Sequence, residues 1–104
     1  MYGLKERDLD YIGKALKAIP SIVEGVIFGS RAMGNYKPGS DIDLAVKGEG
    51  VTRQEVIRLS DMLNEVYPIP FVVDVVHYDS IVSEGLKRHI DQVGCIVYGK
   101  DHES

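Results

Sequence analysis

The sequence predicts an α/β (α+β) fold in which a small mixed β-sheet has helices packed on it. Stretches with helical periodicity alternate with short runs rich in β-branched residues, and turn residues separate the two kinds of segment. A chain of 104 residues buries one core but not two, so residues 1–104 are expected to form a single domain. Hydrophobic residues make up 44% and charged residues 27%, values typical of a soluble globular protein rather than a disordered one.

The first half of the chain predicts a helix, a strand, a short helix and a second strand. In order, these elements are expected over residues 5–19, 23–28, 29–34 and 41–46. Pro20 ends the first helical pattern, and Gly29 ends the β-branched run that follows it. Residues 35–40 are dense in turn formers and predict a loop. Alternation in the second strand places the carboxylates of Asp41 and Asp43 on the same side.

The second half predicts a helix, a strand, a last helix and an edge strand. These elements are expected over residues 52–66, 70–77, 79–93 and 95–98. Thr52 and Glu55 have the spacing of a capping box. The last helix is expected to be capped by Asp79 or Ser80, to bury Val82 on its apolar stripe, and to stop at Gly94.

Composition excludes several classes of function. The net charge is −4 and the basic residues are scattered, so binding to a long nucleic acid is not expected. No apolar run approaches the roughly 20 residues of a membrane span, and no signal-like segment is present, so a cytoplasmic location is expected. Cys95, the single cysteine, is interpreted as a small buried hydrophobe, and residues 101–104 as a frayed end.

Three aspartates indicate a site for a divalent cation. Asp41 and Asp43 are two positions apart, so their side chains are about 6.6 Å apart along a strand. Asp74 interrupts an otherwise apolar strand, where an unpaired buried charge costs several kcal/mol, so it requires a partner or a function. Without a cation, one of the three should take up a proton more readily. Oxygen ligands favour Mg²⁺ or Mn²⁺ over zinc.

The turn between the first strand and the short helix indicates a phosphate site. Gly29 and Ser30 would offer backbone N–H groups and a hydroxyl, and Arg31 could add hydrogen bonds. Ser30 could also act only as a helix cap, and Arg31 could equally make a structural contact. A P-loop is excluded because Asn35 and Tyr36 stand where its Lys and Ser or Thr should follow the second glycine.

The sequence Gly29-Ser30-Arg31-Ala32-Met33-Gly34, followed by Ser40-Asp41-Ile42-Asp43-Leu44, resembles the signature of the DNA polymerase β-like nucleotidyltransferase superfamily. The short chain is similar to its minimal nucleotidyltransferases, the MNT-type antitoxins. The resemblance implies that Gly29 and Ser30 hold the triphosphate of ATP, and that Asp41 and Asp43 bind two Mg²⁺ ions. It also implies that Asp74 binds the catalytic metal and helps to activate the nucleophile. Met33 departs from the family pattern, where a second basic residue is common.

The same resemblance implies a role in a toxin–antitoxin pair. Many minimal nucleotidyltransferases act with an all-helical HEPN-domain partner, and some transfer AMP from ATP onto a tyrosine of that partner. An alternative is a non-catalytic binding module that neutralises a partner by contact. A third interpretation is transfer to a small molecule such as an aminoglycoside. A homo-oligomer is left open.

The histidines are given structural interpretations. His77 ends the third predicted strand, and a satisfied structural histidine is favoured there over a catalytic one. His89 and His102 are weaker candidates for catalysis than His77.

Overall fold

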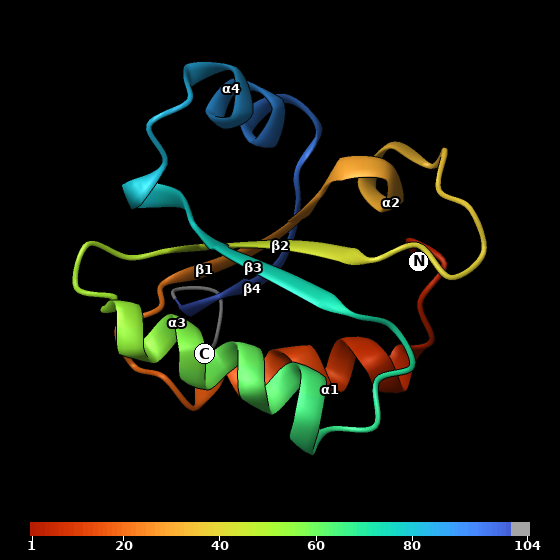
Figure 1. Cartoon of the computed structure of the whole chain (residues 1–104), viewed down its shortest axis with the longest axis horizontal. Coiled ribbons are helices and arrows are strands. Elements are labelled where there is room, and N and C mark those ends of the chain that lie inside the picture. The colour runs from red at the N-terminus through yellow and green to blue at the C-terminus, as the bar shows by residue number, and fades with distance from the viewer. Residues whose placement is uncertain (101–104) are drawn as a thin grey trace.

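The computed structural model describes residues 1–100 and contains one four-stranded sheet with helices on both faces (Figure 1). The strands are β1 (Glu24–Phe28), β2 (Ile42–Lys47), β3 (Val73–His77) and β4 (Cys95–Gly99). Their spatial order is β3-β2-β1-β4, with β2 and β3 parallel and the other neighbours antiparallel. The predicted mixed sheet and edge strand are therefore confirmed. The frayed end expected at residues 101–104 lies outside the described residues.

The helices form two layers, one on each face of the sheet. α1 (Glu6–Lys17) and α3 (Arg53–Asp61) cover one face, and α2 (Gly29–Met33) and α4 (Glu84–Val93) lie on the other (Figure 1). The capping box is confirmed, because Glu55 N–H donates to Thr52 Oγ1 at 3.1 Å and Thr52 N–H donates to Glu55 Oε1 at 2.9 Å. Within residues 1–100, no helix is long and apolar enough to cross a membrane.

Alternate residues of the central strands supply two separate clusters of buried side chains. Ile27 and Leu44 belong to the larger cluster, which also contains Ile12, Leu16 and Leu59 from α1 and α3. The smaller cluster lies on the α4 side and contains Val26, Phe28, Ala45 and Ile90. Since side chains alternate along a strand, the residues of β2 that share a face with Ala45 include Asp43. The Asp43 carboxylate therefore lies on the face of the sheet that α2 and α4 cover.

The helix expected over residues 52–66 changes its geometry near its end. α3 stops at Asp61 and continues as a π-helical segment, Met62–Val66. Within this segment the Asn64 amide accepts from Val73 N–H at 2.8 Å and donates to Val73 O at 2.9 Å. Asn64 thus pairs with the first residue of β3 as a neighbouring strand would. β3 begins at Val73, where Asn64 pairs with it, and not at residue 70 as the sequence predicts.

The predicted start of the last helix is wrong. α4 is capped by Ser83, whose Oγ accepts from Leu86 N–H at 3.2 Å, and not by Asp79 or Ser80. Asp79 and Ser80 lie in a 3₁₀ turn, Tyr78–Ser80, where their side chains form contacts with distant or preceding residues instead of capping a helix. Val82 precedes the helix and is 93% exposed, so it is not part of the apolar stripe.

Candidate active site

The chain turns sharply where β1 gives way to α2. Gly29 has a φ of 71°, in the left-handed region where residues with a side chain are strained. A Cβ at this position would also overlap the Oδ2 atom of Asp43. Both conditions require glycine here, and they place the Gly29–Ser30 turn directly against a carboxylate of the neighbouring strand.

Asp43 and Asp74 are directly opposite one another on neighbouring parallel strands. Strands in a sheet are about 4.8 Å apart, and in-register residues project from the same face. Both carboxylates therefore lie on the α2–α4 face, at the end of the sheet where β1 ends and β2 and β3 begin. Asp41 precedes β2, which starts at Ile42, so it lies in the loop and not in the strand.

The exposure of these aspartates differs from the sequence expectation. Asp41 and Asp74 are exposed, and Asp43 is half-buried. The premise that Asp74 is buried is wrong, because the β3 strand lies at the sheet edge and only Val73 within it is fully buried. Within residues 1–100, none of the three carboxylates makes a hydrogen bond or an ion pair. Within the described part of the chain, no ion pair therefore offsets their charges.

The three aspartates nevertheless interact electrostatically. Burial raises the pKa of Asp43, and the nearby charges of Asp74 and then Asp41 raise it further, while His89 lowers it. This agrees with the expectation that one carboxylate holds a proton more readily. In residues 1–100, no three Asp, Glu, His or Cys side chains are already gathered in the arrangement of a metal site. The three carboxylates are thus close enough to repel one another, but they do not lie close enough together to bind one metal ion in this structure.

His89, a weaker candidate than His77 from the sequence, contacts the turn of the site. From α4, its Nε2 accepts a hydrogen bond from Gly29 N–H at 3.1 Å. Its ring meets the Phe28 ring edge-on, with the centroids 6.0 Å apart. Because 60 positions separate the two residues, no local pattern could reveal the contact.

Ser30 and Arg31 are adjacent but have different surroundings. The Ser30 side chain is half-buried, and its hydroxyl has no hydrogen-bond partner within the described part of the chain. Arg31 is 2% exposed. Its Nε and one terminal nitrogen donate to Ser40 O at 3.0 and 2.6 Å, and the other terminal nitrogen donates to Tyr2 O at 3.0 Å.

Two aromatic rings complete the environment of Arg31. The guanidinium carbon lies 4.2 Å from the centroid of Phe71 and 5.0 Å from that of Tyr36. Burial and these contacts favour the structural interpretation of Arg31 over phosphate binding. Arg31 connects the loop that leads to Asp41 with the segment that leads to β3.

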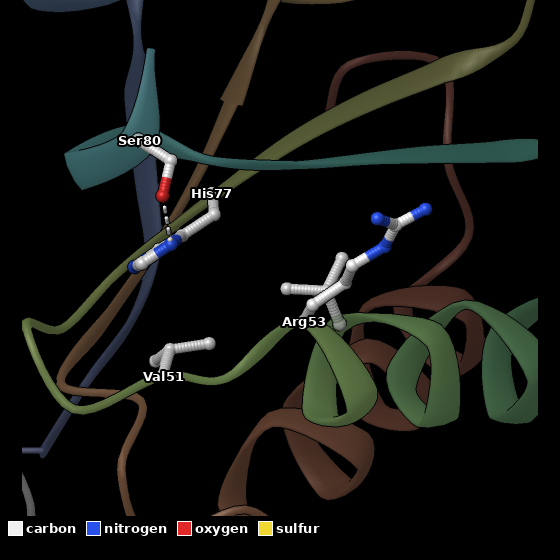
Figure 2. Close-up of a pocket in the computed structure, with 5 residues that line it drawn as sticks. Val51, Arg53, His77 and Ser80 are labelled. Atoms are coloured by element: carbon white, nitrogen blue, oxygen red, sulfur yellow. Dashed lines mark hydrogen bonds between the residues drawn. The ribbon is translucent and has the colours of Figure 1, made fainter.

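A cavity of about 300 Å³ lies elsewhere, lined by Val51, Arg53, Val56, His77 and Ser80 (Figure 2). His77 is at the opposite end of β3 from Asp74 and, by alternation, on the opposite face. Its Nε2 donates to Gly48 O at 2.7 Å, and its Nδ1 is 2.7 Å from Ser80 Oγ. The structural interpretation of His77 fits these bonds, and the cavity is separate from the aspartates.

Three solved structures with a similar fold come from toxin–antitoxin systems. A toxin–antitoxin with AMP-PNP is 27% identical, with a TM-score of 0.73 over 88% of this chain and 73% of that chain. A mutant of the toxin–antitoxin MntA-HpeT is 24% identical, with a TM-score of 0.71 over 88% and 72% of the two chains. A tri-AMPylated HEPN toxin in complex with MNT antitoxin, from Shewanella oneidensis, is 22% identical, with a TM-score of 0.71 over 96% of this chain and 76% of that chain. At these last two identities the likeness concerns the fold alone.

The fold and the arrangement around Gly29 define a domain of the nucleotidyltransferase class. A family model described as "Polymerase beta, Nucleotidyltransferase" matches residues 11–103. The chain belongs to this family. No curated protein matches the sequence.

Proposed function

We propose that this chain is a metal-dependent adenylyltransferase that moves AMP from ATP to a tyrosine hydroxyl of a HEPN-type partner, as the antitoxin of a toxin–antitoxin pair. The observation that carries the proposal is the in-register pair Asp43 and Asp74 beside the Gly29–Ser30 turn. The choice of nucleotide and partner is supported by the similarity to a toxin–antitoxin with AMP-PNP and to the fold of an MNT antitoxin bound to an AMPylated HEPN toxin. A cytoplasmic location is part of the same proposal.

The aspartates fit a hard divalent cation. Their oxygens are the ligands that Mg²⁺ and Mn²⁺ prefer. Burial first, and then the charges of Asp74 and Asp41, raise the pKa of Asp43, and a bound cation would neutralise those charges. By the family pattern, Asp41 and Asp43 would hold two ions and Asp74 would hold one of them. Bound there, two Mg²⁺ ions would neutralise the phosphates and favour departure of pyrophosphate. The side chains would have to come closer together than they lie now.

The remaining groups bind and orient the reactants. The Ser30 hydroxyl has no partner within residues 1–100 and would donate to a phosphate oxygen of ATP. The acceptor oxygen attacks the α-phosphorus, the bond from that phosphorus to the bridging oxygen breaks, and pyrophosphate leaves. The acceptor proton passes to Asp74. Because Asp74 is exposed at the sheet edge, a hydroxyl on another protein can approach it.

The test is transfer of label to the partner. The purified chain, the protein encoded by the adjacent reading frame, Mg²⁺ and ATP labelled at the α-phosphate are incubated together. The partner should become labelled on a tyrosine, and Asp41→Asn combined with Asp43→Asn should abolish the label. Asp10→Asn, at an exposed position on α1, serves as the control and should leave it unchanged. If the double variant neutralises the partner as well as the wild type does, the proposed activity is not the basis of neutralisation.

A further inference from the structure

His89 reaches from α4 to the turn proposed to hold phosphate. Its Nε2 accepts the Gly29 N–H at 3.1 Å, and edge-on packing against Phe28 holds the ring. Nε2 can accept this bond only while it carries a lone pair, as it does in a ring that has its proton on Nδ1. A side chain from the last helix thus fixes the backbone of Gly29, in the first third of the chain.

Gly29 needs such an anchor. Glycine adopts positive and negative φ almost equally well, so its own preference does not maintain the φ of 71° seen here. The β1–β2 pairing ends at Phe28, opposite Asp43, and gives Gly29 no strand partner. Within residues 1–100, the N–H of Gly29 has His89 as its hydrogen-bond partner. This bond restrains the rotation that would move Ser30.

We propose that His89 is a positioning residue: it holds the Gly29–Ser30 turn in the conformation that presents the Ser30 hydroxyl to the triphosphate. The inference rests on the proposed function, since it assigns His89 a task in binding ATP. The Gly29 N–H donates to His89 on α4 in this structure, so the phosphate contact assigned to the turn in this proposal is the Ser30 hydroxyl. A turn fixed before the nucleotide arrives spares the entropy of ordering it, so removing the bond lowers nucleotide affinity.

The proposal is tested with variants that keep or remove the acceptor. Glutamine carries its amide oxygen about as far from the backbone as Nε2 of histidine, whereas the oxygen of asparagine is one bond shorter. Calorimetry should show that His89→Ala and His89→Asn weaken Mg²⁺–AMP-PNP binding about tenfold, because the turn must then be ordered when the nucleotide binds. His89→Gln should bind within about threefold of the wild type. Arg88→Ala, at the exposed neighbouring position on α4, is the control and should bind normally.

Transfer kinetics and NMR give two further readouts. In labelling assays, His89→Ala should raise the KM for ATP more than it lowers kcat, because the acceptor hydroxyl and Asp74 are unchanged. The amide proton of Gly29 should exchange with solvent faster in His89→Ala than in His89→Gln. Melting temperatures of all variants show whether a loss of binding reflects unfolding.

The outcomes separate the two proposals. If the wild type binds AMP-PNP and His89→Ala binds it equally well, the positioning role is refuted and the proposed function stands. Equal losses in folded His89→Gln and His89→Ala also refute it. If the wild type itself binds no nucleotide, the proposed function fails and this inference fails with it. Should His89→Ala not fold, the comparison of His89→Gln with His89→Asn decides the matter.

Discussion

Replacing Asp43 by asparagine is expected to stabilise the folded protein while abolishing nucleotidyl transfer. Burial, followed by the charges of Asp74 and Asp41, raises the pKa of Asp43. A raised pKa means that ionising this carboxyl is less favourable in the folded chain than in the unfolded one. The resulting penalty is absent below the ordinary aspartate pKa of about 3.9 and grows as the pH rises through the raised value. At pH 7 the asparagine variant escapes it.

The size of the gain follows from the geometry. In-register neighbours on adjacent strands place the charges of Asp43 and Asp74 about 5–6 Å apart. At that separation two unit charges repel by about 3 kcal/mol at an effective dielectric of 20 and by less than about 1 kcal/mol in bulk water. Because Asp74 is exposed, the lower end applies, and a gain of about 1 kcal/mol is expected. For a chain of this length that raises Tm by about 4–6 °C.

Calorimetric melting at low ionic strength measures this gain. Asp43→Asn should melt above the wild type at pH 7, and the difference should vanish near pH 3 and shrink in about 1 M salt. Mg²⁺ should raise the Tm of the wild type more than that of the variant. Asp10→Asn, which removes an exposed carboxylate from α1, should show neither effect. A variant that is no more stable than the wild type at pH 7, or equally stabilised at pH 3, would refute the reasoning.

Three further substitutions probe the surroundings of the site. Gly29→Ala should destabilise by at least about 1–2 kcal/mol in urea unfolding, because it places a side chain at a φ of 71° and against a carboxylate. Arg31→Met leaves the Ser40 carbonyl without its donors and should cost about 2–3 kcal/mol, while AMP-PNP affinity measured well below Tm changes less than about threefold. A loss of affinity without a loss of stability would restore a phosphate role for Arg31. Asn64→Ala removes two bonds to Val73 and should cost about 1–3 kcal/mol, with faster exchange of the Val73 amide as the check.

The elements that a local pattern specifies could be predicted from the sequence. Alternation in β2 places Asp43 on one face and Ile42 and Leu44 on the other, and their burial has this pattern. Ala45 shares the face of Asp43 but is also buried, in the cluster that contains Ile90 of α4. The spacing of Thr52 and Glu55 predicted the capping box that starts α3. Gly29 was expected at a strand-to-helix turn, and the turn is there. Each of these depends on residues within a few positions of one another.

Features that depend on distant contacts could not be predicted. His89 pairs with Gly29 across 60 positions, and Asn64 pairs with the edge of β3, so neither role has a signature in its own segment. The apolar neighbours of Asp74 predict a buried carboxylate, but the exposure of an edge strand depends on which elements cover it. Ser80 was selected as a cap, and its hydroxyl lies instead beside the His77 ring.

The motif around Gly29 combines a ligand-binding task with a folding task in adjacent residues. Successive residues of a helix point about 100° apart, so Ser30 and Arg31 at the start of α2 cannot face the same surroundings. Arg31 points into the protein and binds the Ser40 carbonyl, immediately before Asp41, while the Ser30 hydroxyl stays without a partner within residues 1–100. The arginine therefore acts on the site through the loop that carries Asp41. A change at position 31 should alter stability first, and a change at position 30 should alter nucleotide affinity first, because only the serine has a side chain available to a ligand.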